Sequence, residues 1–287
     1  MRTRSGTGTA LFAGMLVAAP LWSGELLDAV KQGDLGAVEQ TLGADPAEVN
    51  VADESGRTPL HWAAKGGSVP VAKALLSGGA DLKARDAYGN APLHLAVLQG
   101  SEDLVGVLVG AGADVKAVAF NRYTPLHLAA WSGSTEVAQL LADNGAEVRA
   151  QDYDMRTPLH YASTRGVVEA LLAAGADVNA RHVPWARTPL LDAAMHGFRE
   201  AVEALLDHGA DLQAKNCSHF TALHWAAWGG HTEVVKVLLA RGADPYYQDD
   251  SGYDALHWAE YWGHQDVVRL LKNKMAETPC TADPQRE

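Results

Sequence analysis

The segment Thr124-Pro-Leu-His-Leu-Ala-Ala-Trp-Ser-Gly133 decides the fold, because its first four residues recur, with small changes, along almost the whole chain. The other copies of this tetrapeptide begin at Thr58, Ala91, Thr157, Thr188, Thr221 and Asp254 and read T-P-L-H, A-P-L-H, T-P-L-H, T-P-L-L, T-A-L-H and D-A-L-H. From Thr58 onward, successive starts lie 33, 33, 33, 31, 33 and 33 residues apart. A fixed period of this length predicts stacked supersecondary units rather than one closed core.

Each unit predicts two short helices. Thr or Asp caps the first helix, and proline is tolerated in its first turn because the missing N–H has no partner there. The apolar stretch 126–133 then ends at glycine, and a second stretch at 134–145 carries apolar residues at helical spacing before another glycine. A Gly-Ala-Asp phrase leads into an extended stretch and a polar turn, as at 79–86.

This T-P-L-H…G-A-D pattern resembles the ankyrin repeat, over about residues 25–275. The resemblance implies an all-α solenoid of paired antiparallel helices, stacked in a curved array with β-turn fingers on one side. It also implies that the Thr and His of the tetrapeptide tie neighbouring units together by hydrogen bonds. We assign that role to Thr58, His61, Thr124, His127, Thr157 and His160. His208, His231 and His264 stand where histidine is common in such units and need no special role.

The first 24 residues have the features of an export signal. Arg2 and Arg4 precede an apolar run at 10–19, and the small residues Ser23 and Gly24 follow. The run is too short to span a bilayer, which needs about 20 apolar residues. This pattern predicts a cleaved signal peptide over 1–24 and a periplasmic or secreted protein. A membrane anchor and a disordered tail are the alternatives.

We expect the remaining chain to form one repeat domain, with no room for a second. An N-terminal capping repeat is expected at 25–52, because the stretch matches the helix pair without the tetrapeptide. Seven repeats, numbered 1 to 7 below, start near residues 53, 86, 119, 152, 182, 216 and 249. The polar segment 276–287 is expected to be a disordered tail.

Three departures from the pattern fall near the middle of the array. Repeat 4 has three residues fewer between Thr157 and Gly175, which we place around 166–168. The following finger carries one extra residue within 181–187, and repeat 5 has Leu191 in place of histidine, followed by Asp192. These departures predict a local change in curvature, and a binding pocket there is a hypothesis.

Charge and motifs exclude several function classes. The net charge of −12 argues against gripping nucleic-acid backbones or adsorbing to anionic membranes. The chain has no G-x-S-x-G, phosphate-binding glycine loop or H-E-x-x-H motif. We therefore expect a monomeric, non-enzymatic protein without a cofactor or metal.

Binding of another protein is the default role of a solenoid, whose inner helices and fingers line an extended concave face. Large aromatic residues and methionine are enriched at interface centres. The candidate partner-binding residues are Tyr88, Phe120, Tyr123, Trp131, Tyr153, Trp185, Met195, Phe220, Trp228, Tyr253, Tyr261 and Trp262. Trp62, Trp225 and Trp258, directly after the tetrapeptide, are expected to pack between units.

Three functions remain open from the sequence. The leading one is an exported scaffold or adaptor that binds one or more proteins. A secreted effector that binds host proteins uses the same binding physics and differs only in its destination. The third is a metal- or redox-responsive protein that uses Cys217 with His182, His196 and His219. A disulfide between Cys217 and Cys280 is also left open.

Overall fold

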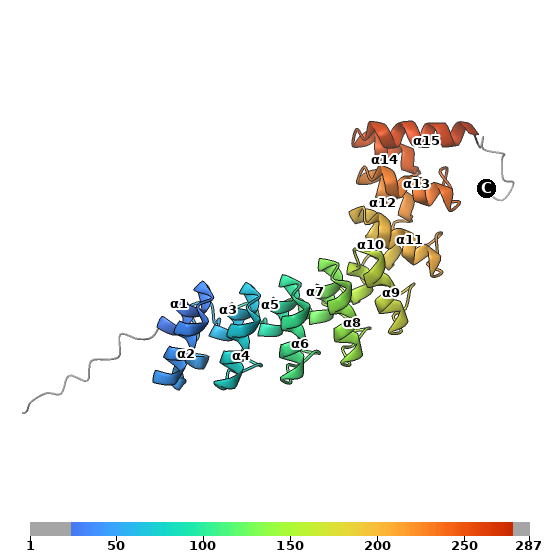
Figure 1. Ribbon diagram of the computed structural model, residues 1–287. Helices are drawn as coiled ribbons and strands as arrows, with labels where there is room; N and C mark the ends of the chain where they lie inside the picture. Colours follow the sequence, from blue (N-terminus) through green and yellow to red (C-terminus); the bar gives the residue numbers. More distant parts are fainter. Residues whose placement is uncertain (1–23, 278–287) are drawn as a thin grey trace, which may run out of the picture.

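The computed structural model describes residues 24–277, which fold into a single row of helix pairs (Figure 1). Fifteen α-helices and three 3-10 helices make up this part of the chain, and it contains no strand. The all-α solenoid is therefore confirmed. The predicted signal peptide, apart from Gly24, lies outside the described residues. The last helix runs to Glu277, two residues into the predicted tail, and 278–287 also lie outside.

Inner and outer helices alternate along the chain. The inner helices are α1 (Glu25–Gln32), α3 (Pro59–Gly66), α5 (Pro92–Gln99), α7 (Pro125–Ser132), α10 (Pro189–His196), α12 (Ala222–Trp228) and α14 (Ala255–Tyr261). The outer helices are α2 (Leu35–Ala44), α4 (Val69–Ser77), α6 (Glu102–Gly110), α8 (Thr135–Asp143), α9 (Arg165–Ala173), α11 (Arg199–Asp207), α13 (Thr232–Ala240) and α15 (Gln265–Glu277). The 3-10 helices are η1 (Pro46–Asn50), η2 (Phe120–Arg122) and η3 (Pro158–Tyr161).

Helix α7 shows why the repeated segment folds as it does. The Thr124 hydroxyl accepts the backbone N–H of His127, and the Thr124 N–H donates to His127 Nδ1, 3.2 Å away. This capping box satisfies two amide groups that the first turn cannot pair internally. The helix ends at Gly133, whose φ of 75° is a left-handed conformation that glycine adopts without steric cost.

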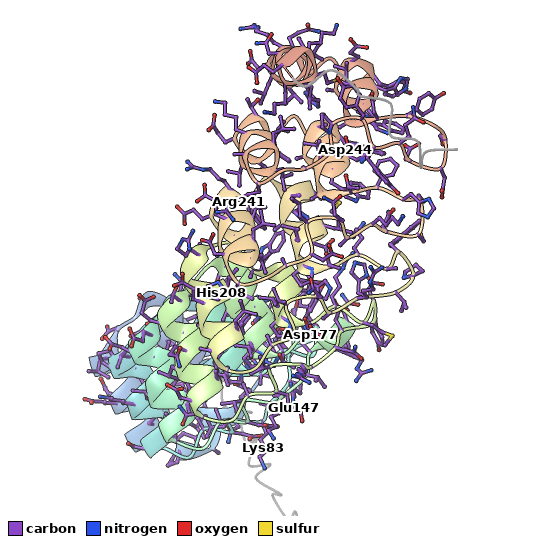
Figure 2. The ribbon with its side chains drawn as sticks, turned by 90° about the vertical axis from the view of Figure 1, so that its right-hand side faces the viewer. Lys83, Glu147, Asp177, His208, Arg241 and Asp244 are labelled. Atoms are coloured by element: carbon purple, nitrogen blue, oxygen red, sulfur yellow. The ribbon has the colours of Figure 1, made fainter. Side chains whose placement is uncertain are left out.

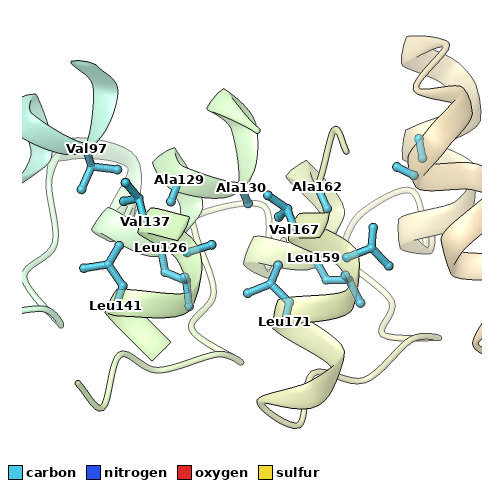
Figure 3. Packing of buried hydrophobic residues seen from close by; sticks show 14 of the residues in the cluster. Val97, Leu126, Ala129, Ala130, Val137, Leu141, Leu159, Ala162, Val167 and Leu171 are labelled. Carbon is cyan, nitrogen blue, oxygen red and sulfur yellow. The ribbon is translucent and has the colours of Figure 1, made fainter. Parts of the chain in front are cut away.

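One apolar core runs through the whole array. Leu126 of α7 and Leu141 of α8 are buried, and Leu159 and Leu171 take the same places in repeat 4 (Figure 3). Each repeat thus covers the apolar side of its neighbour, as a solenoid requires. On the surface, the loops after the outer helices are ordered by their aspartates. The Asp177 carboxylate, for example, accepts the N–H of Asn179 (Figure 2).

A row of buried histidines links the repeats. His61 Nε2 lies 3.0 Å from the carbonyl oxygen of Asn90 in the next finger. The other links join His94 to Tyr123 at 3.3 Å, His127 to Arg156 at 3.1 Å, His160 to Arg187 at 3.3 Å and His224 to Tyr253 at 3.2 Å. Burial lowers the pKa of all five rings, to about 4 for His94 and His160. The inter-repeat bonds implied by the resemblance are therefore present, and neutral rings make them.

Two further histidines link repeats, against the expectation that they need no special role. His231 Nε2 lies 3.0 Å from the carbonyl oxygen of Met195, and His264 Nε2 lies 2.8 Å from that of Trp228. Each ring leaves room only for glycine in the preceding repeat, since a Cβ built on Gly197 comes 2.5 Å from His231 Nδ1.

Repeat 4 lacks half of its inner helix. The 3-10 turn η3 ends at Tyr161, and Thr164 already caps the outer helix α9. The three missing residues therefore belong between Tyr161 and Thr164, and their expected placement around Gly166 is wrong. Val167 and Val168 must stay buried in the core, so only the more exposed second turn of the inner helix could be lost. The array bends at repeat 4, and the inner helices lie on the inside of the bend (Figure 1). The predicted local change in curvature is therefore present.

Candidate functional site

The missing helical turn leaves a pocket of about 460 Å³ on the inner face, here called the repeat-4 notch. Its lining residues are Leu98, Tyr123, His127, Leu128, Trp131, Arg156, His160, Tyr161, Asp192, Met195 and His196. They come from α5, α7, η3, α10 and two fingers. The volume falls within the range of ligand pockets, roughly 300–1,000 Å³.

Trp131 spans the notch from repeat 3 to repeat 5. Its ring centroid lies 6.0 Å from that of His196 and 6.3 Å from that of Phe198, with edge-to-face geometry in both pairs. It also meets Tyr161 edge-to-face at 6.2 Å. A full second turn in repeat 4 would separate Trp131 from repeat 5, so these contacts depend on the deletion. Half of Trp131 remains exposed, which leaves the ring available to a ligand.

Hydrogen bonds fix the tyrosines of the notch. The Tyr161 hydroxyl donates to Asp152 Oδ2 at 2.6 Å, and the Tyr123 hydroxyl lies 3.2 Å from the Tyr161 hydroxyl. Burial raises the pKa of Tyr161. The hydrogen bond to Asp152 raises it further, whereas the hydrogen bond from Arg156 lowers it. Tyr161 therefore stays protonated at neutral pH, and the wall holds its shape through its own polar groups.

A buried ion pair forms the repeat-5 side. Asp192 is 2% exposed, and its Oδ1 accepts a 2.6 Å hydrogen bond from Arg187 Nε. Its Oδ2 lies 3.4 Å from Nε2 of the buried His182. Burial acts to raise the pKa of Asp192, but His182 and Arg187 more than offset it, so the pKa is lowered and the carboxylate is charged. The departure of repeat 5 from the tetrapeptide therefore supplies a fixed, compensated charge beside the notch.

Repeats 6 and 7 carry a second aromatic group, the tryptophan stack. Trp228 lies at its centre, stacked against Trp225 at 5.5 Å, Trp258 at 5.2 Å and Trp262 at 5.7 Å. Trp225 and Trp258 do pack between units, as expected. Phe220 is only 8% exposed and contacts Trp225, so its assignment to partner contact is wrong. Phe220 directly precedes the tetrapeptide of repeat 6, and aromatic rings of repeats 6 and 7 cover it.

The other predicted residues lie outside the notch. Tyr88, Phe120, Tyr153 and Trp185 are exposed on separate fingers. Tyr253 and Tyr261 are also exposed, but their rings meet Trp258 edge-to-face at 5.9 and 6.0 Å. Of the twelve candidates, the structure brings Tyr123, Trp131 and Met195 together in the notch. Sequence reasoning missed Arg156 and Tyr161 as their neighbours. The three-residue deletion was the signal that could have found them.

The described residues offer little to the metal hypothesis. Within 24–277, no group of three or more His, Cys, Asp or Glu side chains could hold a metal ion. His182 is buried beside Asp192, while His219 contacts Asp250 on the fingers. Cys217 is a free, exposed thiol, and Cys280 lies outside the described residues. The same part of the chain has no helix long and apolar enough to cross a membrane.

Comparison with known proteins identifies the repeats. A family model described as ankyrin repeats (3 copies) matches residues 26–119, 112–182 and 159–249. A second, described as ankyrin repeats (many copies), matches 229–272. Together these matches run from the capping repeat into the last helix pair.

One curated relative shares a short stretch with this chain. Palmitoyltransferase akr1 from Schizosaccharomyces pombe is 42% identical over 57 residues. The match covers 20% of this chain and only 9% of that protein, so it reflects a shared ankyrin segment. The fold, the histidine links and the family matches lead to one conclusion: the chain belongs to the ankyrin-repeat family, whose repeats are generally protein-interaction modules and typically non-catalytic.

Proposed function

We propose that this protein is an exported, non-catalytic adaptor that holds a protein partner on its inner face, centred on the repeat-4 notch. The observation that carries the proposal is Trp131, which is half exposed at the edge of a preformed pocket on the inside of the bend. Binding energy concentrates in large aromatic residues that sit in such pockets near the centre of an interface.

The bend supports this location for a partner. The inner helices of repeats 1–3 and of repeats 5–7 line the two sides of the bend (Figure 1). A partner seated at the notch can therefore contact both arms, whereas a partner on the fingers meets aromatic residues spaced one repeat apart. Preformed concave surfaces also bind with a smaller ordering cost than surfaces that must rearrange.

Matched tryptophan variants test the binding face. Trp131 and Trp185 are each 50% exposed, but Trp131 borders the notch and Trp185 lies on a finger. Proteins captured by the wild-type chain are identified by mass spectrometry, and the affinity of a purified candidate is measured for both variants. We expect Trp131→Ala to weaken binding about 30-fold or more, as for an interface hot spot, and Trp185→Ala to change it little. The reverse ranking would assign binding to the fingers.

Export is tested separately. The basic start and short apolar run of the first 24 residues support removal of a signal peptide. N-terminal sequencing of the protein from fractionated cells should find it starting near Glu25 in the periplasm. Protein in the medium or in host cells would favour the effector alternative. An intact Met1 in the cytoplasm would overturn export altogether.

A further inference from the structure

Arg156 lacks the partner that its counterpart in repeat 1 has. Arg57 and Arg156 both precede a T-P-L-H tetrapeptide, and Arg57 Nε donates to Asp86 Oδ2 of the next finger at 3.4 Å. The backbone N–H of Asp86 donates to the carbonyl oxygen of Asn90, the residue before the next tetrapeptide. In the finger after Arg156, the equivalent hydrogen bond runs from the N–H of His182 to the carbonyl oxygen of Arg187, so His182 occupies the position of Asp86. An imidazole side chain therefore replaces the expected carboxylate, and Arg156 Nε is buried without a hydrogen-bond partner.

The remaining contacts of Arg156 compensate its charge only in part. Its guanidinium donates to the Tyr161 hydroxyl at 3.3 Å and lies 3.6 Å from Asp154 Oδ2, on a carboxylate side chain that is 55% exposed. Burial acts to lower the pKa of Arg156, but Tyr161 and the nearby carboxylates raise it further, so the group is cationic. About a quarter of the side chain is exposed, and it lines the notch.

Most other polar groups of the notch are already paired within the protein. His127 and His160 are neutral and hydrogen bonded at both ring nitrogens. Asp192 is paired with Arg187 through Oδ1, its Oδ2 is buried without a hydrogen-bond partner, and its carbonyl oxygen lies 2.9 Å from His196 Nδ1. What the notch offers a ligand is therefore ring and aliphatic surface together with one under-paired cation.

We infer that the notch binds a polypeptide segment in which a large apolar side chain stands next to a carboxylate. The apolar group fills the space between Trp131, Met195 and Leu98, and the carboxylate pairs with the exposed part of the Arg156 side chain, which lines the notch. The carboxylate is the C-terminal group of the partner, beside its last side chain. This inference rests on the proposed function, because it names the chemistry of the partner at the same site.

Small probes can test this chemistry without knowledge of the partner. N-acetylphenylalanine carries the ring and the carboxylate, its amide lacks the charge, and N-acetylalanine lacks the ring. Each is titrated into the ¹⁵N-labelled protein, and the indole N–H signal of Trp131, assigned from its loss in Trp131→Phe, is followed. We expect the acid to shift this signal with a millimolar Kd and to bind about fivefold more tightly than the amide. N-acetylalanine should leave the signal unchanged.

Matched arginine variants locate the charge. Arg156→Gln should abolish the preference for the acid over the amide, and Arg156→Lys should retain part of it. Arg57→Gln, which removes an arginine that already has its carboxylate, should leave the preference intact.

Several outcomes would overturn the inference. They are equal binding of acid and amide, an acid preference that survives Arg156→Gln, and preference for phenethylamine, which would make Asp192 the dominant charge. Absence of any Trp131 shift with the acid would also reject it. The contrast between Trp131→Ala and Trp185→Ala in partner binding stays independent of these probes, so the proposed function can survive their failure.

Discussion

His127 holds the following repeat by one bond, because its Nε2 lies 3.1 Å from the carbonyl oxygen of Arg156, 29 residues along the chain. The same ring accepts the backbone N–H of Thr124 and contacts the Thr124 hydroxyl at 2.9 Å. One neutral side chain therefore satisfies a helix start and a neighbouring finger at once. Repeat 5 lacks this arrangement, since Leu191 stands at the histidine position and the buried Thr188 hydroxyl has no hydrogen-bond partner.

Two threonine variants should therefore differ in stability. Thr124→Val removes a hydroxyl that is bonded to His127 and should lower the free energy of unfolding by about 1–2 kcal/mol. Thr188→Val removes a buried hydroxyl with no partner, so it should be neutral or stabilising by up to about 1 kcal/mol. Urea unfolding followed by circular dichroism measures both. Equal losses would show that the hydroxyl bond contributes nothing.

Stability should decrease as the pH falls from 7.5 to 5. Unfolded histidines titrate near pH 6.5, whereas burial lowers the folded pKa of His94 and His160 to about 4. Between these values the unfolded chain binds more protons, so acidification favours unfolding. At pH 5 each of these two histidines should cost about 2 kcal/mol. Unfolding free energies at the two pH values test this, and equal values at both would contradict it.

The tryptophans should separate into structural and binding residues. Trp228 stacks on three other tryptophans, so Trp228→Ala should lower the free energy of unfolding by about 2–3 kcal/mol. Trp131 is half exposed, and Trp131→Ala should cost less than about 1 kcal/mol while weakening partner binding. Thermal unfolding of both variants gives the comparison. A larger stability loss for Trp131→Ala would make that ring structural.

Restoring the missing turn should straighten the array. Inserting Ala-Lys before Ser163 and Gly after it gives repeat 4 the same length as repeat 3 between the tetrapeptide and the outer helix. The completed inner helix should separate Trp131 from His196 and reduce the bend, since the deletion is what allows repeats 3 and 5 to meet. Small-angle X-ray scattering should then report a larger radius of gyration. An unchanged radius, with the helix content increased, would assign the bend to another cause.

The candidate site was only partly predictable from sequence. Trp131 and Met195 were recognised because they stand at exposed positions of the inner helices, and Tyr123 because it stands on a finger. Arg156 and Tyr161 were not, because the same repeat positions elsewhere make structural contacts: Arg57 pairs with Asp86, and Trp62 donates to Asp53. In repeat 4, His182 replaces the carboxylate that would pair with Arg156. Tyr161 keeps the equivalent bond, to Asp152, but lines the notch because the deletion follows it.

The sequence by itself determined the repeat and the helix boundaries outside repeat 4, and its resemblance to the ankyrin repeat implied the links made by the tetrapeptide histidines. These follow from signals within a few residues, such as a capping threonine, a terminal glycine and a fixed period, and each unit repeats them. Only the tertiary structure decided that the deletion falls after Tyr161, that Phe220 is covered by Trp225 and by Trp258 of the next repeat, and that Trp131 reaches His196. The last two outcomes involve contacts between residues of different repeats, and burial is a property of the neighbours that cover a side chain rather than of the side chain alone.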